Sequence, residues 1–265
     1  MTTQEGKRKT EVSKEKLASQ LHDGKVSSLD RYKDKAYGTR SLLTVLAGDL
    51  KVFLFGDMAG GAGYLFRKMF YANMFRKAGR GTIFGRWMVL RHPGKISLGD
   101  RVSIDDNVML DASGAGEQGI TLGDDVIISR NCVIQGKTGP IRIGNRADIG
   151  VGCIFSSITG IDVGQAVLIA GQCYIGGGQY RSDRLDIPMM DQGNYSTGPV
   201  VIGDDVWLGS GVAVLDGVQV GKGAIIGSGA VVTRDIPEYS IAVGVPARVV
   251  SNRAERAGRG GEGTR

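Results

Sequence analysis

A chain of 265 residues can hold one or two domains. Its 43 glycines are far above average usage, which indicates low-complexity sequence unless the glycines recur at a regular spacing. The net charge of +6 suits a phosphate-bearing cofactor or an anionic surface, but much of it lies in the two terminal segments. We therefore expect no nucleic-acid partner.

Residues 1–40 are rich in charge and poor in apolar anchors, so we expect a flexible or loosely helical segment. The first residues, MTTQEGKRKTEVSKEK, contain no apolar stretch of the kind that a secretory signal needs. We therefore expect a cytoplasmic protein.

Residues 41–90 form a second segment, in which an apolar run around Leu42–Phe55 is broken by Asp49 and Lys51. The run is shorter than the ~20 apolar residues that span a bilayer. Two interpretations stay open. The segment is a helical cap that hides the open end of the following fold, or its part 41–77 is also a basic amphipathic surface that contacts anionic lipid at the inner face of the membrane.

From Leu98 onward an aliphatic residue recurs every six residues, and a glycine often follows it. A helix repeats near 3.6 residues and a strand near 2, so a period of six predicts a solenoid of very short parallel strands. The residues expected to point inward are Leu98, Ile104, Leu110, Leu122, Ile128, Ile134, Ile143, Ile149, Phe155, Val163, Ile169, Ile175, Ile202, Leu208, Val214, Val220, Ile226 and Val232.

The six-residue spacing is interrupted only after every third member, which predicts three sides per coil and insertions at one corner. Residues 91–250 should thus form an all-β prism of about six triangular coils, stacked at ~4.8 Å. The longest interruption, 176–199, should protrude as a loop, and 251–265 should be a flexible tail. Long excursions from a regular scaffold are usually functional or disordered, so this loop is the first place to look for chemistry.

The three cysteines occupy equivalent positions in successive coils: Cys132, Cys153 and Cys173 each come four residues after the inward aliphatic residue of the second side. An odd number of cysteines at inward positions predicts small apolar filler rather than disulfides. A reducing compartment agrees with this interpretation.

The stretch VIGDDVWLGSGVAVLDGVQVGKGAIIGSGAVVTRDIPEYSIAVGVPARVV, residues 201–250, closely resembles the end of the galactoside, maltose and O-antigen type O-acetyltransferases. These belong to the hexapeptide-repeat acyltransferases, and the resemblance covers about residues 91–250. It implies a left-handed parallel β-helix, a homotrimer, and transfer of an acetyl group from acetyl-CoA to a hydroxyl of a sugar or polysaccharide.

The resemblance also implies a binding site for the CoA thioester in the groove between neighbouring prisms. Gly209, Ser210 and Ser228 would line its pantetheine arm, and Thr233 and Arg234 would lie further along it. Arg248 would contact the nucleotide phosphates, for which a guanidinium is well suited.

One position departs from the family pattern. The general base of the family is a histidine in the protruding loop, and the corresponding residue here is Tyr180. The chain has only His22 and His92, neither of them near this loop. A phenol is ionised in only ~0.1% of molecules at pH 7, and a carboxylate such as Asp183 is a weak base.

Three explanations remain open for the missing histidine. Tyr180 acts as a base with help from Asp183, Arg181 or Arg184; or the protein catalyses by positioning alone; or it is a catalytically impaired relative that acts as a CoA-binding, scaffold or adaptor protein. We expect no metal, because a β-helical carbonic anhydrase would need three histidines around zinc.

Overall fold

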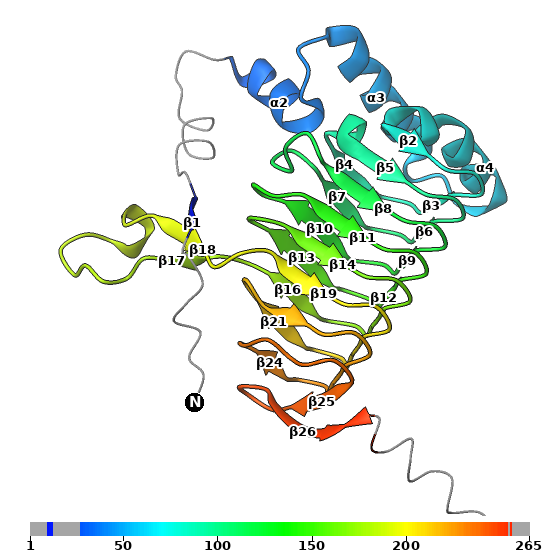
Figure 1. Ribbon diagram of the computed structural model, residues 1–265. Helices are drawn as coiled ribbons and strands as arrows, with labels where there is room; N and C mark the ends of the chain where they lie inside the picture. The colour runs from blue at the N-terminus through cyan, green and yellow to red at the C-terminus, as the bar shows by residue number, and fades with distance from the viewer. Residues whose placement is uncertain (1–9, 13–26, 254, 256–265) are drawn as a thin grey trace, which may run out of the picture.

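The structure, a computed structural model, describes residues 10–12, 27–253 and 255. Most of these residues form a three-sided prism of stacked parallel coils with helices at one end (Figure 1). The predicted fold class is confirmed: the chain is a left-handed parallel β-helix with an N-terminal helical cap. His22 and most of the predicted tail 251–265 lie outside the described residues.

Each of the three sides is one parallel sheet, and we number the sides in the order in which the chain visits them. Side 1 contains β2 (Lys77–Ala78), β5 (Ile96–Leu98), β8 (Ile120–Leu122), β11 (Ile141–Ile143), β14 (Ile161–Val163), β19 (Val200–Ile202) and β22 (Gln219–Val220). Side 2 contains β3 (Ile83–Phe84), β6 (Ser103–Ile104), β9 (Ile127–Ile128), β12 (Asp148–Ile149), β15 (Leu168–Ile169), β20 (Trp207–Leu208), β23 (Ile225–Ile226) and β25 (Ser240–Val243). Side 3 contains β4 (Val89–Arg91), β7 (Met109–Asp111), β10 (Val133–Gly136), β13 (Ile154–Ser157), β16 (Tyr174–Gly176), β21 (Ala213–Leu215) and β24 (Val231–Val232).

These strands make seven full coils, one more than the pattern from Leu98 indicates. The additional coil is the first, formed by β2, β3 and β4. Its core positions Ala78, Phe84 and Leu90 also lie six residues apart. The coil is completed from the cap, because the buried rings of Tyr71 and Phe75 pack against Phe84, with ring centroids 6.0 and 5.4 Å from it.

The core consists of inward side chains stacked in register from coil to coil. On side 3, for example, Ile134 lies between Leu110 and Phe155, and all three are completely buried. The cysteine prediction holds as well, since Cys132, Cys153 and Cys173 are free and buried. The adjacent thiols, together with burial, raise the pKa of Cys153, which keeps it protonated.

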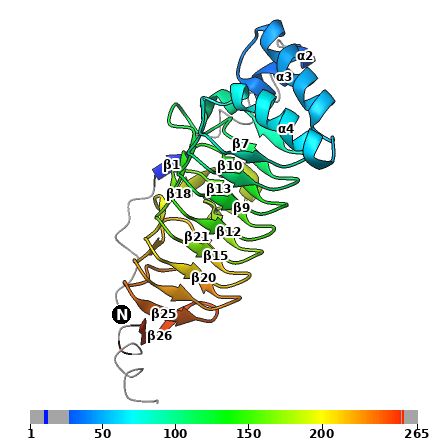
Figure 2. The same ribbon diagram turned by 90° about the vertical axis from the view of Figure 1, so that its right-hand side faces the viewer.

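Three helices close the first coil: α2 (Ser28–Tyr37), α3 (Leu42–Phe55) and α4 (Gly60–Tyr71), the last followed by the 3-10 turn η1 (Ala72–Met74) (Figure 2). Arg67 of α4 connects cap and prism. Its buried guanidinium donates hydrogen bonds to the carbonyls of Phe55, Met58 and Phe84, at 3.0, 2.7 and 2.9 Å. It thereby satisfies a carbonyl that the C-terminal end of α3 leaves open.

The other end of the prism is closed by β26 (Arg248–Asn252), which pairs antiparallel with β25 and enters the predicted tail. The side chain of Arg253 contacts Asp205 at 2.7 Å. Within the described part of the chain, no helix is long and apolar enough to cross a bilayer.

Insertions gather at the corner between sides 3 and 1, as the six-residue spacing predicts. The longest connection there leaves the prism after β16 and returns at β19. It contains β17 (Gln179–Tyr180), the turn η3 (Met189–Asp191) and β18 (Asn194–Ser196), and the short strand β1 (Thr10–Val12) pairs with β18. The short turn η2 (Pro93–Lys95) lies at the same corner, between the first two coils.

We predict that truncation of an inward isoleucine is far more damaging than truncation of an outward one in a neighbouring strand. Ile134→Ala should lower the free energy of unfolding by about 2–5 kcal/mol, because it removes buried methyl groups and leaves a cavity. Ile154 is 42% exposed on the outer face of the same side, so Ile154→Ala is the matched control and should cost far less. Urea unfolding of both variants measures the difference, and equal losses would contradict the inward assignment.

Candidate functional site

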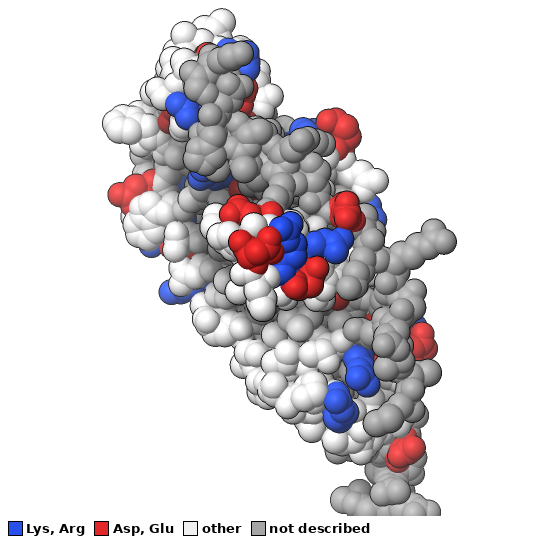
Figure 3. All heavy atoms as spheres, turned by 90° about the vertical axis from the view of Figure 1, so that its left-hand side faces the viewer, with Lys and Arg blue, Asp and Glu red and all other residues white. Residues whose placement is uncertain are grey.

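The protruding loop, residues 177–199, leaves the fifth coil after Gly176, which is the first of three consecutive glycines. At Gly176 the φ of 114° is one that side chains rarely adopt, and a Cβ would lie 2.3 Å from the carbonyl oxygen of Ser156. Acidic and basic side chains mix over the loop, where red and blue atoms gather at the centre of Figure 3. Below the loop, toward the C-terminal coils, Figure 3 shows a broad area of uncharged atoms with a few basic and acidic groups at its right-hand side.

The returning limb of the loop is fixed by Asp216, a buried carboxylate that follows β21. Asp216 accepts hydrogen bonds from the hydroxyl of Ser196 at 2.8 Å, and from the backbone N–H and hydroxyl of Thr197 at 2.6 and 3.0 Å. Ser196 in turn lies 3.0 Å from the hydroxyl of Thr159. The base of the loop is therefore tied to two coils, whereas its tip projects into solvent.

The two predicted catalytic residues lie in the outer part of this loop. Tyr180 is in β17, opposite Asn194, with 63% of its surface exposed, and Asp183 is exposed beyond the strand. Among the described residues no hydrogen bond or ion pair joins Tyr180 to Asp183. The loop arginines also have other partners: Arg181 contacts Glu11 at 2.9 Å, and Arg184 forms an ion pair with Asp186.

The Arg184–Asp186 pair is local and exposed. The guanidinium holds the pKa of the Asp186 carboxyl below its usual range by hydrogen bonding, and the carboxylate raises the pKa of Arg184 in return. Arg184 and Asp186 are paired with each other, and among the described residues neither forms a hydrogen bond or ion pair with Tyr180. In this conformation they therefore do not stabilise a phenolate of Tyr180.

His92 is occupied by a structural role. It lies at the corner between sides 3 and 1 after the first coil, where its backbone N–H donates to Ala36 at 2.8 Å and its Nε2 lies 2.6 Å from the carbonyl oxygen of Asp34. That carbonyl can only accept, so the ring hydrogen is on Nε2. His92 thus binds α2 to the prism, four coils from the protruding loop.

Three of the predicted cofactor residues come together at the corner between sides 2 and 3. Gly209 and Ser210 belong to the sixth coil and Ser228 to the seventh. A Cβ at Gly209 would lie 2.6 Å from the backbone nitrogen of Ser228, so only glycine fits there. In these two coils the corner is built from Gly209-Ser210-Gly211 and Gly227-Ser228-Gly229, with no side chain longer than serine.

The other three predicted cofactor residues lie elsewhere around the same face. Thr233 and Arg234 follow β24, so they lie across side 3 from Ser228. Arg248 begins β26 with an exposed side chain. Between the two corners, the outer face of side 3 presents Ala213, Leu215 and Val231, which are small or apolar.

A polar row on the outer face of side 3 escaped the sequence analysis. It consists of the residues that follow the inward aliphatic position in the first four coils: Arg91, Asp111, Gln135 and Ser156. Asp111 is 4% exposed and accepts from Gln135 Nε2 at 3.1 Å, with Arg91 Nε 3.8 Å away. The hydroxyl of Ser156 is buried without a hydrogen-bond partner among the described residues.

This row ends where the loop begins, because Ser156 pairs with Gly176. A buried hydroxyl without a partner is a group that a bound hydroxyl could satisfy. The signal was present in the sequence as a polar residue at one fixed place of four successive coils. The six-residue period is defined by the inward aliphatic residues, so it does not by itself reveal a pattern in the outward ones.

Family models match two parts of the prism. The model described as a bacterial transferase hexapeptide of six repeats matches residues 199–234, and the hexapeptide repeat of succinyl-transferase matches residues 101–135. Both models describe hexapeptide-repeat transferases, and together with the fold they support membership of that family. Residues 199–234 contain the glycine–serine corner of the last two coils, and residues 101–135 contain Asp111 and Gln135 of the polar row.

Two curated hexapeptide-repeat relatives are similar in sequence. "Probable acetyltransferase Rv3034c" of Mycobacterium tuberculosis is 40% identical over 134 residues, which are 51% of this chain and 44% of that protein. "Putative lipopolysaccharide biosynthesis O-acetyl transferase WbbJ" of Escherichia coli is 29% identical over 61% of this chain and 74% of that protein. The chain thus matches less than half the length of the first relative.

A solved structure supports the fold. The N-acyltransferase AntD of Bacillus cereus, in complex with dTDP and 3-hydroxybutyryl-CoA, superposes with a TM-score of 0.51 at 18% identity. The match covers 73% of this chain and 91% of AntD. At this identity the likeness describes architecture alone.

We predict that Asp216 controls the order of the loop. Asp216→Ala leaves the buried donors of Ser196 and Thr197 unsatisfied, at a cost of about 1–3 kcal/mol. Trypsin should then cleave several-fold faster after Arg181 and Arg184, as followed by mass spectrometry. Asp191→Ala, an exposed change in the same loop away from both cleavage sites, is the control and should leave cleavage unchanged; equal acceleration in both variants would contradict the anchoring role.

Proposed function

We propose that this hexapeptide-repeat transferase moves an acetyl group from acetyl-CoA to a hydroxyl of a sugar or polysaccharide. The observation that carries the proposal is the outer face of side 3 in the last two coils. It is small and uncharged, it has the serine–glycine corner at one edge, and at the other edge it has the anchored loop and Thr233. The names of the acetyltransferase relatives point to the same reaction class.

The residues around this face fit a CoA thioester. A pantetheine arm is long, narrow and uncharged, and it can lie along the corner where no side chain is longer than serine, beside the apolar Leu215 and Val231. Arg234 and Arg248 are exposed near the end of the prism, where guanidinium groups can pair with the nucleotide phosphates. When bound, acetyl-CoA would supply the activated acetyl group.

The acceptor hydroxyl belongs, in this proposal, near the end of the polar row. Ser156 and Asp111 can hydrogen-bond sugar hydroxyls, and Ser156 lies beside Gly176 at the mouth of the loop. Transfer forms an ester bond at the acceptor oxygen and breaks the carbon–sulfur bond, and the hydroxyl proton must leave. Tyr180, in its phenolate form, is proposed to receive that proton, with the Asp183 carboxylate nearby in the loop, and CoA would leave as its thiolate.

The proposed assembly is a homotrimer with the CoA site between prisms. Side 2 supports it, because four apolar residues are exposed in one row on its outer face: Ile83, Ile127, Leu168 and Trp207, exposed by 43, 46, 51 and 49%. Ser103 and Asp148 interrupt this row. A second copy would cover this row. We also propose a cytoplasmic location, with 41–77 touching the inner face of the membrane through exposed residues such as Leu43 and Phe53.

We predict that Arg248 contributes to CoA affinity. Arg248→Ala removes a charge-assisted hydrogen bond and should weaken CoA binding by about tenfold or more in isothermal titration. Arg80 is the control, because its side chain is 96% exposed in the first coil, far from the proposed site. Equal weakening in Arg80→Ala would indicate a general electrostatic effect, and no binding to the wild-type protein at millimolar CoA would favour a scaffold role.

We predict that Tyr180 determines the rate of thiol release from acetyl-CoA. If the phenol takes the proton, Tyr180→Phe should lower kcat by about 10²–10⁴-fold and leave the affinity for CoA unchanged. Tyr180→His tests the other explanation, since a large gain would mean that a base is missing at this position. Unchanged activity in both variants would remove Tyr180 from the mechanism.

A further inference from the structure

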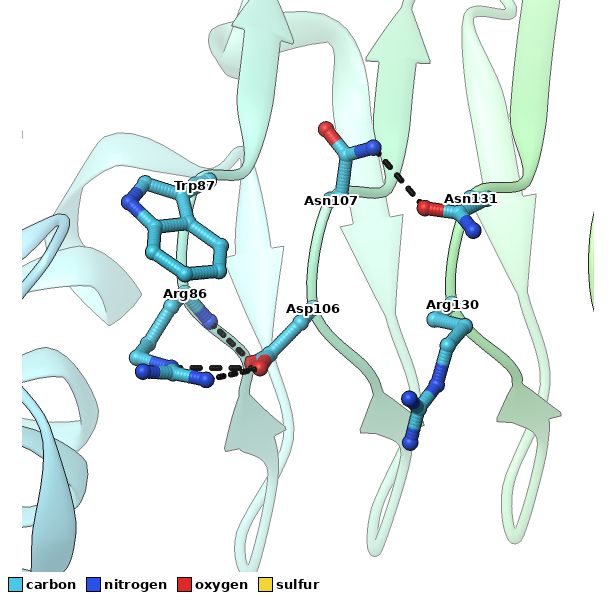
Figure 4. Close-up of a pocket in the computed structure, with 6 residues that line it drawn as sticks. All are labelled: Arg86, Trp87, Asp106, Asn107, Arg130 and Asn131. Atoms are coloured by element: carbon cyan, nitrogen blue, oxygen red, sulfur yellow. Dashed lines mark hydrogen bonds and ion pairs between the residues drawn. The ribbon is translucent and has the colours of Figure 1, made fainter.

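A pocket lies at the N-terminal end of the prism, on the same corner between sides 2 and 3 that carries Ser210 and Ser228 near the other end. It is a pocket of about 510 Å³ at the corner between sides 2 and 3 of the first three coils. Six residues line it: Arg86, Trp87, Asp106, Asn107, Arg130 and Asn131 (Figure 4). The corner thus carries long polar and aromatic side chains here, and only glycine and serine in the last two coils.

Each of the three coils contributes one pair of residues to this pocket. Figure 4 shows the indole and the two amides in one row, and the two guanidinium groups and the carboxylate in a row beside it. Neighbouring coils are ~4.8 Å apart, so each row has one polar or aromatic side chain every ~4.8 Å. The Asn107 amide donates to Asn131 at 2.8 Å, and the remaining amide oxygen of Asn107 and amide nitrogen of Asn131 make no hydrogen bond to described residues.

The charges of the pocket are paired. Arg86 donates to the Asp106 carboxylate from Nε at 3.1 Å and from its terminal nitrogen at 2.8 Å. Arg130 lies 3.5 Å from Asp105 and remains 65% exposed. A site with matched acids and bases does not select a phosphate, and its polar lining does not suit a lipid chain.

Trp87 is an unusual residue type for its place in the corner, where Asn107 and Asn131 of the next two coils share its left-handed backbone. Its φ of 53° lies in the left-handed region, where a bulky residue is uncommon, whereas the same corner in later coils carries residues that include Gly152, Gly211 and Gly229. Its ring is still 50% exposed, with the Arg86 guanidinium 4.4 Å from the ring centroid. Strain of this kind persists mostly where function requires the side chain.

We propose that this pocket is a saccharide-binding subsite, separate from the reacting centre. The apolar face of a pyranose ring would stack on the exposed indole, and the free amide groups and Arg130 would bind its hydroxyls. Along the same corner, Asn131 lies three coils or ~14 Å from Ser210, and Trp87 lies five coils or ~24 Å from it, which suits a chain of several sugar units. Its use in holding a polymeric acceptor rests on the proposed function; saccharide binding by itself does not.

The test is isothermal titration of the full chain, without CoA, against hexasaccharides of glucose, of mannose and of N-acetylglucosamine at millimolar concentration. At least one should bind, and Trp87→Asn should weaken it at least about tenfold, equivalent to 1.4 kcal/mol. Asparagine already occupies this position in the next two coils, so the Tm of Trp87→Asn should stay equal or rise. Tyr239→Asn is the matched control, because Tyr239 is an aromatic residue that is 39% exposed and has a left-handed backbone, with φ of 56°, at the other end of the prism.

A second variant separates recognition from folding. Asn131→Gly keeps the left-handed backbone, which has φ of 62°, and removes the amide, so it should weaken binding several-fold at unchanged Tm. The proposal is overturned if none of the three saccharides binds, if Tyr239→Asn weakens binding as much as Trp87→Asn, or if Trp87→Asn unfolds the chain. Loss of acetyl transfer alone, with saccharide binding intact, would count against the proposed function and leave the subsite standing.

Discussion

The whole molecule depends on the in-register stacking of inward side chains between parallel coils. Ile134 packs on Leu110 below and Phe155 above because the strands that carry them pair residue for residue. One extra residue within a side would shift that register and turn an apolar side chain toward solvent. The sides are therefore constrained to a fixed length, and variation is confined to outward-facing positions and to the corner between sides 3 and 1.

This constraint explains how the candidate site is made. Backbone positions on side 3 are set by the coil geometry, so chemistry can change only by substitution along outward rows, as in the step from Asp111 and Gln135 to Gly176 and Leu215. The loop is the exception, because it leaves the prism where length is free. It still needs a fixed base, and the buried carboxylate of Asp216 provides that base by satisfying three donors at once.

The period of six was sufficient to predict coils 2 to 7, their inward residues, the free cysteine ladder and the place of the loop. It did not reveal the first coil, because the interior there is completed by Tyr71 and Phe75 from the cap rather than by aliphatic residues alone. The partners of the loop residues could not be predicted from the sequence either, because the contacts of Arg181 with Glu11 and of Arg184 with Asp186 follow no repeat. The hydroxyl of Ser156 looks ordinary in sequence, and only its burial makes it conspicuous.

The effect of a tyrosine at the position of the family's histidine can be compared in magnitude with the effect of positioning the reactants. A phenol with an ordinary pKa near 10 is ionised in ~0.1% of molecules at pH 7, which limits a phenolate base to roughly a thousandth of its full effect. Well-oriented reactants, by contrast, reach effective concentrations on the order of 10⁵–10⁸ M. In the proposed reaction, a rigid prism that held a thioester on one edge and a hydroxyl at the end of the polar row would exploit mainly this second effect. If Tyr180 stands in the place of the family's histidine, as proposed, the substitution would lower the rate that such a scaffold can reach, but positioning would still give it a means to catalyse.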